Sequence, residues 1–263
     1  MTTVGSEWDV VGRTVTRADV SKVRKATVPT LARRIAALDW DSLRRSLDED
    51  GFVTTPPLLT PAECDGLIAL YPRDERFRST VVMTRHAFGS GEYRYLAYPL
   101  PRLVQSLRRQ LYAQLAPLAN GWAQALGGKR DFPTDLDDYL ARCHATGQTR
   151  STPLLLRYRT GDYNRLHQDL YGELAFPLQA AFCLSRRGQS FEGGESLLVE
   201  QRPRMQSRGD AIALDQGEML IFANRDRPVQ GKRGFYRATM RHGVSRLRAG
   251  ERYALGIIFH DAA

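Results

Sequence analysis

The chain contains little cysteine, and its few cysteines follow no known pattern. Its 263 residues include three cysteines, Cys64, Cys143 and Cys183. An odd number of widely spaced cysteines argues against a disulfide framework, and none has the short spacing of a zinc site. The cysteine usage therefore predicts reduced thiols in a cytoplasmic protein.

Long apolar runs are missing as well. No segment approaches the roughly 20 apolar residues that are needed to cross a bilayer. The first residues, MTTVGSEWDVVGRTV, lack a basic region followed by an apolar one, so we expect no secretory signal and no membrane partner. A content of 42% apolar and 25% charged residues is typical of globular proteins, and 263 residues allow one large core with a helical annex.

Acidic residues are scarce in one part of the chain. The formal net charge is +9, and the segment from Gln201 to Arg252 holds 12 Lys or Arg against 5 Asp or Glu. A basic face attracts phosphate backbones, with an affinity that falls as salt rises. The cluster predicts a DNA or RNA partner if it surrounds a site, and solvated arginines if it does not. The oligomeric state stays open.

Helix signals dominate the first half of the chain. Thr60 and Glu63 have the spacing of a capping box, with Pro61 at the first helical position. Apolar residues at helical spacing predict a long helix from residue 103 to 126 that is kinked or split at Pro117.

Strand signals dominate after about residue 150. Short strand candidates separated by Gly-containing turns predict a β-sandwich or barrel: TPLLLRYRT, PLQAAFCLS, ESLLVEQ, DAIALDQ, EMLIFAN, RATMRHGVS and RYALGIIFH. We therefore expect an ill-defined N-terminal arm (1–40), a helix-rich support region with a substrate loop (41–149) and an all-β core (150–263).

Three residues in the β region have the chemistry of an iron site. His167 and Asp169 stand two apart, so at the end of a strand both side chains point to one face. His242 lies 73 residues beyond Asp169, which leaves room for several intervening strands. Two imidazoles and one carboxylate form the facial triad of iron(II) oxygenases. Ten residues later, Arg252 begins the last strand and offers a guanidinium to a carboxylate.

This pattern resembles the 2-oxoglutarate- and iron(II)-dependent dioxygenases. The flanking stretches LLLRYRTGDYNRLHQD, FEGGESLLV, GEMLIFAN and RYALGIIFHDA agree with that superfamily, and the last is similar to prolyl-hydroxylase-like members. The resemblance implies an α+β fold with a double-stranded β-helix core (jelly-roll, cupin-like) and N-terminal helical support.

A narrower resemblance spans most of the chain. The stretches FRSTVVMTRHAFGSGEYRYLAYPLP, CHATGQTRSTPLLLRY, HQDLYGELAFPLQ and EQRPRMQSRGDA are similar to a bacterial family of oxygenases acting on nucleic acids. The activity predicted for that family is oxidative demethylation of damaged DNA bases.

The superfamily resemblance assigns roles to individual residues. His167, Asp169 and His242 are expected to bind iron(II), and Arg252 to bind the distal carboxylate of the cosubstrate 2-oxoglutarate. O2 is the further reactant. Tyr158 is expected to line the cosubstrate pocket and Gln179 to donate to the cosubstrate; core packing is the open alternative for Tyr158, and a purely structural role is the open alternative for Gln179. Many members have serine two residues after the basic residue, where this chain has Ala254, so one hydrogen bond is either missing or supplied elsewhere.

Two basic, aromatic segments are candidate substrate walls. They are the loop around residues 78–95 and the segment from Asn224 to Arg241, where basic groups alternate with aromatics as they do in single-strand and flipped-base sites. The candidate substrate residues are Arg78, Arg85, His86, Tyr93, Tyr95 and Arg237.

The leading hypothesis is thus a dioxygenase that demethylates modified nucleic-acid bases and releases succinate and CO2. The alternative is a prolyl-type protein hydroxylase or a small-molecule hydroxylase, which would form a stable hydroxylated product. A third possibility is a jelly-roll binding module without turnover.

Overall fold

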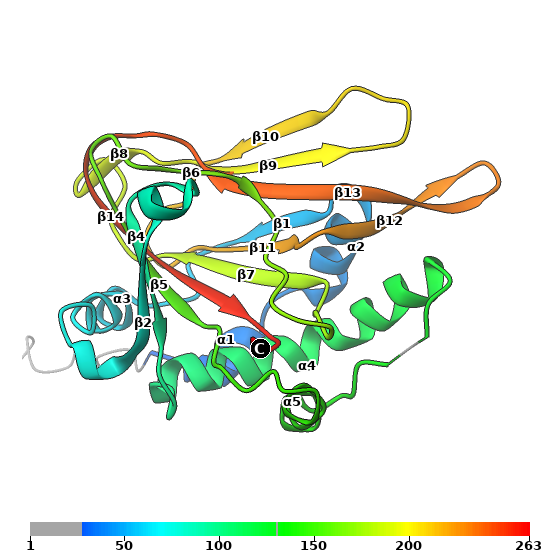
Figure 1. Cartoon of the computed structure of the whole chain (residues 1–263), viewed down its shortest axis with the longest axis horizontal. Helices are drawn as coiled ribbons and strands as arrows, with labels where there is room; N and C mark the ends of the chain where they lie inside the picture. Colours follow the sequence, from blue (N-terminus) through cyan, green and yellow to red (C-terminus); the bar gives the residue numbers. More distant parts are fainter. Residues whose placement is uncertain (1–27, 130) are drawn as a thin grey trace, which may run out of the picture.

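Two antiparallel β-sheets face each other in a computed structural model of the chain (Figure 1). The structure describes residues 28–129 and 131–263. Most of the expected N-terminal arm lies outside the described residues. The remainder of that arm contains a helix, α1 (Leu31–Ala36), whose N-cap is Thr30.

The larger sheet, called the major sheet here, has the strand order β1-β11-β7-β14-β5-β4-β2, with β8 paired to β14. It crosses the expected boundary at residue 150, because β1, β2 and β4 come from the helix-rich region. Its strands are β1 (Phe52–Thr55), β2 (Phe77–Val82), β4 (Glu92–Leu96), β5 (Leu154–Arg159), β7 (Leu178–Cys183), β8 (Phe191–Gly193), β11 (Met219–Ala223) and β14 (Leu247–Ile258).

The smaller sheet, called the minor sheet, has the order β10-β9-β13-β6-β3, with β12 paired to β13. Two of its hairpins, β9–β10 and β12–β13, project beyond the rest of the fold (Figure 1). Its strands are β3 (Gly89–Ser90), β6 (Tyr163–His167), β9 (Ser196–Gln201), β10 (Arg208–Ile212), β12 (Asp226–Gly231) and β13 (Gly234–Val244).

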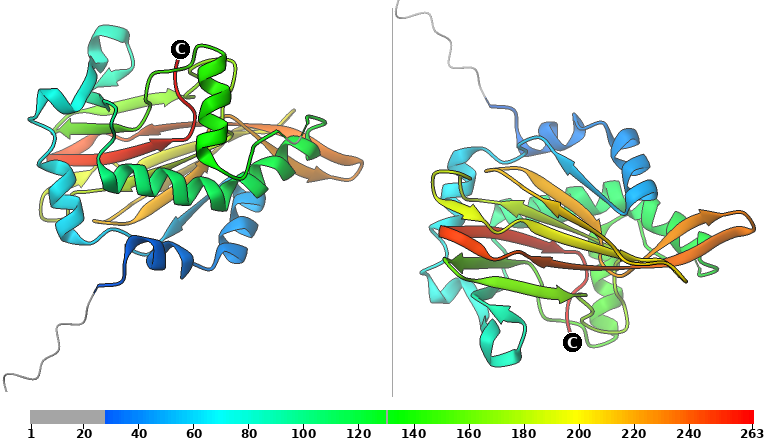
Figure 2. Two further views of the ribbon diagram at one scale, coloured as in Figure 1. Left: turned by 90° about the horizontal axis from the view of Figure 1, so that it is seen from below. Right: turned by 90° about the horizontal axis from the view of Figure 1, so that it is seen from above.

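Helices cover one side of this sandwich. α1, α4 and α5 lie on the face of the major sheet that is turned away from the minor sheet (Figure 1). No described helix lies over the outward face of the minor sheet (Figure 2). The remaining helices are α2 (Trp40–Asp50), α3 (Pro61–Ile68), α4 (Arg102–Ala125), α5 (Leu136–Ala145) and the 3₁₀ turns η2 (Asp74–Arg76) and η3 (Met83–His86). None of the described helices is both long and apolar enough to cross a membrane.

The capping box predicted for α3 is confirmed. Thr60 Oγ1 accepts from the backbone N–H of Glu63, whose carboxylate accepts from the backbone N–H of Thr60 at 2.8 Å. Of the two outcomes predicted at Pro117, a kink or a split, the split is wrong, because α4 continues through the proline as one helix. Its apolar face, which includes Ala116 and Leu118 on both sides of the proline, is buried in the core. Tertiary packing thus holds the helix despite the missing hydrogen bond.

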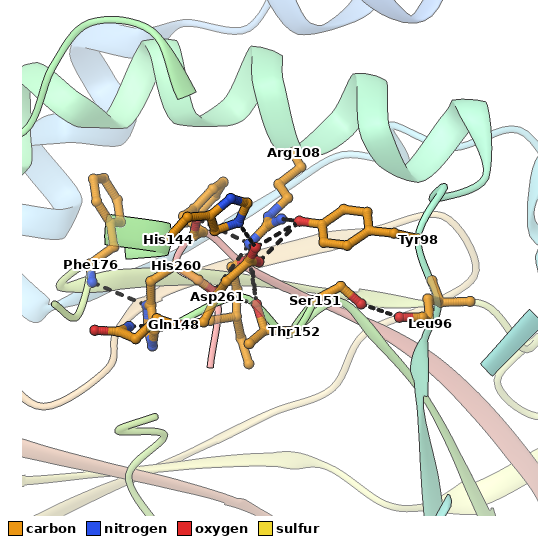
Figure 3. Close-up of polar contacts among 12 residues, drawn as sticks. Leu96, Tyr98, Arg108, His144, Gln148, Ser151, Thr152, Phe176, His260 and Asp261 are labelled. Carbon is orange, nitrogen blue, oxygen red and sulfur yellow. Dashed lines mark hydrogen bonds and ion pairs between the residues drawn. The ribbon is translucent and has the colours of Figure 1, made fainter. Parts of the chain in front are cut away.

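A buried ion pair fixes the end of β14 to α4 (Figure 3). Arg108, only 1% exposed, donates to a carboxylate oxygen of Asp261 at 2.8 Å and to the carbonyl of Ile258 at 2.9 Å. Tyr98 donates to the same carboxylate at 2.9 Å, and His144 Nε2 lies 2.8 Å from it. Every polar atom of this carboxylate therefore has a partner, as burial of a charge requires.

The same network reaches the segment that follows Asp169. Gln148 Nε2 donates to the carbonyls of Asp261, at 2.7 Å, and Leu174, at 2.9 Å. The backbone N–H of Leu174 donates back to Gln148 Oε1 at 2.7 Å. The helical layer thereby positions the loop that leads away from the predicted iron site.

Candidate active site

The three predicted iron ligands converge between the two sheets. His167, at the end of β6, is the cross-strand partner of His242 on β13, and their ring centroids are 4.2 Å apart. Asp169 lies next to both rings: its Oδ1 is 3.5 Å from His167 Nε2, and its Oδ2 is 3.2 Å from His242 Nε2. One potential ligand atom from each residue falls within 4.8 Å of the others. This is the donor set of an iron(II) facial triad.

The protonation states also fit a metal. His167 Nδ1 lies 2.8 Å from the carbonyl of Arg165, which places its proton there and leaves the Nε2 lone pair free. Burial and the neighbouring His242 lower the pKa of His167, so its ring is neutral near pH 7. Burial alone would raise the pKa of Asp169, but hydrogen bonding from His242 and the charges of both histidines outweigh it and lower the pKa. A neutral imidazole and a carboxylate are the ligand forms that a metal requires.

Asp169 is held at its backbone and at its side chain. The amide of Asn224, at the end of β11, accepts from the backbone N–H of Asp169 at 2.9 Å and donates to its carbonyl. Tyr171 donates to Asp169 Oδ1 at 2.6 Å, and Tyr95 donates to the Tyr171 hydroxyl at 3.0 Å. Gln179, on β7, donates to Asp169 Oδ2 at 3.1 Å. These contacts fix the carboxylate before any metal binds.

The role expected for Gln179 needs correction. Its amide nitrogen, predicted to donate to the cosubstrate, donates instead to Asp169 and to Asn224 Oδ1, the latter at 2.9 Å. Both amide protons are thereby used within the protein. Gln179 lines the cavity but serves to orient the carboxylate ligand.

Arg252 is a buried cation without an acidic partner. It is 4% exposed, and no carboxylate among residues 28–129 and 131–263 forms an ion pair with it. Its guanidinium carbon lies 5.8 Å from the ring centroid of Tyr158 and 5.9 Å from that of Phe191. The Tyr158 hydroxyl is buried and has no hydrogen-bond partner among the described side chains. A buried guanidinium without a carboxylate partner and a buried phenol without a hydrogen bond, both lining one cavity, fit the carboxylate of 2-oxoglutarate.

The cavity itself has a volume of about 370 Å³. The iron-site residues and Arg252 all line it, and apolar walls such as Leu156, Leu198 and Phe222 separate the polar groups. Ala254 lines it as well, and Ser196 contributes a hydroxyl to the same cavity. Ser196 is thus a candidate source of the hydrogen bond that a serine at position 254 would supply.

The predicted substrate residues separate into several groups. Tyr93 lines the cavity, and the exposed ring of His86 stacks on Phe88, which lines it too, with centroids 5.3 Å apart. Arg85 is exposed on η3 and does not line the cavity. Its role in substrate binding stays a prediction.

Three of those predictions place residues wrongly. Arg78 does not line the cavity: it donates to the carbonyl of Ser151 at 2.7 Å, and its guanidinium covers the ring of Tyr95 at 4.3 Å. Tyr95 is buried and donates a hydrogen bond to the hydroxyl of Tyr171, so it does not face the cavity. Arg237 points away from the cavity, because it is an odd number of residues from His242 on the same strand.

Several site residues escaped the sequence analysis. Asn224 and Tyr171 hold the carboxylate ligand, while Arg165 and Leu166 line the cavity mouth at an irregular step between β6 and β13. A tyrosine two residues after the ligand was a local signal for Tyr171. No local signal marks Asn224, which lies 55 residues from Asp169 in sequence.

Comparison with known proteins places this site in a family. Residues 91–262 match a family described as oxygenases that catalyse oxidative methylation of damaged DNA. The matched segment contains the three predicted iron ligands and Arg252. Two uncharacterized proteins of Mycobacterium tuberculosis are each 56% identical over 165 residues, which cover 63% of this chain and 71% of theirs.

Solved structures agree on the fold. An oxidoreductase of the 2-oxoglutarate–Fe(II) oxygenase family from Burkholderia pseudomallei is 15% identical with a TM-score of 0.50, over 86% of this chain and 94% of that one. A non-heme α-ketoglutarate-dependent carbocyclase from nogalamycin biosynthesis is 13% identical with a TM-score of 0.50, over 85% of this chain and 84% of that one. The predicted α+β fold with a double-stranded β-helix core is confirmed. The chain belongs to the nucleic-acid oxygenase family that its sequence matches, and it is an enzyme built on the fold of the 2-oxoglutarate- and iron(II)-dependent oxygenases.

Proposed function

We propose that this enzyme uses iron(II), 2-oxoglutarate and O2 to remove methyl groups from modified nucleic-acid bases. The observation that carries the proposal is the presence of the triad and of Arg252, a buried cation without a carboxylate partner, within a segment that matches a family acting on damaged DNA. The cavity mouth supports it, because Phe88 is 47% exposed there beside the basic Arg165. An exposed ring next to a cation suits a base taken out of its stack.

The chain's own residues have distinct tasks in this proposal. His167, Asp169 and His242 hold the metal, which when bound supplies oxygen activation coupled to conversion of 2-oxoglutarate into succinate and CO2. Arg252 and Tyr158 bind and orient the distal carboxylate of the cosubstrate. The apolar walls exclude water, which strengthens the electrostatic contacts inside.

Release of formaldehyde distinguishes this activity from simple hydroxylation. Oxidation of an N-methyl group gives a hydroxymethyl amine, which breaks down to the free amine and formaldehyde. Hydroxylation of a ring or aliphatic carbon leaves a stable product that is heavier by one oxygen atom.

The test is a panel of methylated and unmodified oligonucleotides, single-stranded and duplex, DNA and RNA, incubated with Fe(II) and 2-oxoglutarate. We expect succinate and formaldehyde to form in equal amounts with a methylated strand. The variant His167→Ala should abolish both products, whereas His144→Gln, on α5, keeps them. Turnover that stays at background with every methylated strand would refute the proposal, and so would a hydroxylated peptide or small molecule formed without formaldehyde.

A further inference from the structure

The strand that carries His242 has a second, outward-facing row of side chains. Because side chains alternate along a strand, Tyr236, Ala238, Met240 and His242 share the inward face of β13, and Phe235, Arg237, Thr239 and Arg241 share the outward face. The burial pattern agrees: Ala238 and Met240 are buried, whereas Phe235, Arg237 and Arg241 are exposed. We call the outward set the β13 outer row.

The β13 outer row lies on an open surface. It belongs to the face of the minor sheet over which no described helix packs (Figure 2). The hairpin that contains it projects from the fold, with the exposed Lys232 and Arg233 at its tip (Figure 1). Phe235, next to that tip, is 53% exposed. Large exposed aromatic side chains among cations are typical of interaction surfaces.

The charge of this row is only partly neutralised. One carboxylate oxygen of Asp226 lies 3.6 Å from the Nε atoms of both Arg237 and Arg225, so a single negative charge offsets part of two positive charges. Arg241 has no acidic partner among the described residues. Exposed pairs at such distances contribute little, so these arginines are available to another anion.

The β13 outer row lies on the strand that also carries His242, on the opposite face of the minor sheet. Arg241 stands next to His242, whose cross-strand neighbour on β6 is His167. Before His167, the irregular step in β6 exposes Arg165 and Leu166, and the backbone N–H of Arg165 donates to the carbonyl of Phe88. Cationic and aromatic groups therefore occur both at the mouth, at Phe88 and Arg165, and along the outward face of the same sheet, where Phe235 is about 20 Å beyond Arg241 along the strand.

We infer that this face is the binding track for the backbone of a single-stranded nucleic acid whose target base enters the cavity. The inference takes its choice of partner from the proposed function. Arginines at alternate positions bind phosphates, and Phe235 supplies a ring on which a flanking base stacks. A single strand is favoured over a duplex because the cavity accepts only a base that has left the stack.

Binding to the metal-free protein tests this inference independently of turnover. The probe is an unmodified, fluorescently labelled single strand of about a dozen nucleotides, within the range of known single-strand sites, and its anisotropy is followed as salt rises. The double variant Arg237→Gln/Arg241→Gln should bind about tenfold more weakly and lower the salt slope by about 1.4, because each arginine neutralises one phosphate and each such contact on a single strand contributes about 0.7. The matched control, Arg102→Gln/Arg109→Gln on α4, removes the same charge and should match the wild-type protein.

Phe235→Ser separates stacking from charge. It should weaken single-strand binding about fivefold or more with the salt slope unchanged. The inference is overturned if the β13 double variant binds as the control does, if a duplex binds more tightly than the single strand, or if poly-glutamate of equal charge competes as well as the strand. Methyl removal that persists with normal strand binding in the double variant would overturn this track and leave the proposed function standing. Arginine-dependent strand binding without any turnover would support this track and refute the proposed function.

Discussion

Replacing Arg252 by methionine should abolish cosubstrate binding and leave the fold intact. Arg252 is buried but faces the cavity, and it has no carboxylate partner among the described residues. Burying a charge without a carboxylate partner costs several kcal/mol, which the two aromatic rings next to it offset in part. Removing the charge therefore relieves a penalty. We expect the ligand-free variant to be as stable as the wild-type protein or more stable by about 1 kcal/mol.

Arg108 provides the matched contrast, because its charge is buried with a partner. Its guanidinium and the carboxylate of Asp261 are 1% and 0% exposed and lie 2.8 Å apart. Arg108→Met leaves that carboxylate buried without its cation, which costs about 3–5 kcal/mol. For a chain of this size, 1 kcal/mol corresponds to about 2–4 °C in melting temperature, so we expect a fall of about 6–20 °C.

Thermal melts with and without 2-oxoglutarate, under anaerobic Fe(II), measure both effects. At a concentration of 100 times Kd, the cosubstrate should stabilise the wild-type protein by about 2.7 kcal/mol. It should stabilise Arg252→Met by close to nothing. The reasoning is refuted if Arg252→Met loses as much stability as Arg108→Met, or if 2-oxoglutarate raises the melting temperature of both the variant and the wild-type protein equally.

Two further predictions concern the metal site and pH. Asn224→Ala removes the amide that brackets the backbone of Asp169, so it should weaken metal binding by about 10- to 100-fold. The control is Asn120→Ala, which removes the same pair of side-chain hydrogen bonds to the backbone N–H and carbonyl of Phe132. It should leave metal affinity unchanged in the same titration. Burial and the charge of Arg108 lower the pKa of His260 to about 4, so the unfolded chain binds more protons and stability falls as pH drops from about 6.5 towards 4. His260→Gln should lose about 2 kcal/mol less than the wild-type protein between pH 7.5 and pH 5 in urea titrations, and equal losses would contradict this prediction.

The predicted iron ligands were accessible from sequence because their signals are local. His167 and Asp169 stand two apart at the end of β6, and Arg252 belongs to a strand whose apolar pattern is clear, although β14 begins at Leu247 and not, as expected, at Arg252. His242 lies in a strand candidate of the same kind. Short-range periodicity indicates which face a side chain takes, and the resemblance to the 2-oxoglutarate-dependent dioxygenases then implied which of these residues bind iron.

Interactions that depend on distant parts of the chain were out of reach. Gln179 was expected to donate to the cosubstrate, but its amide donates to Asp169 and to Asn224, which is 45 residues away in sequence. Arg78 was expected in the substrate pocket, yet the carbonyl of Ser151 and the ring of Tyr95 hold it elsewhere. Which of several polar groups a long side chain reaches is set by tertiary packing, which sequence spacing does not encode.

Arg237 is a different kind of error, because the correct signal was present. It stands five residues before His242 in one strand, and an odd separation puts two side chains on opposite faces. The alternation that places His167 and Asp169 on one face therefore also excludes Arg237 from the cavity wall. The same parity places Arg241 beside it on the outward face.

The register of β13 consequently decides both the chemistry and the proposed binding surface. A slip by one residue would turn Arg241 into the cavity and His242 out of it. Pairing with β9, where Leu198 opposes His242, sets this register. A buried ion pair reinforces it: Arg227 on β12 donates to Glu200 on β9 from across β13, at 2.7 Å through Nε. Glu200 also accepts from Arg202, so its charge is compensated and the three strands are fixed together. An ion pair that would be a poor source of stability is well suited to specifying one register, because every slipped pairing leaves its charges buried and separated.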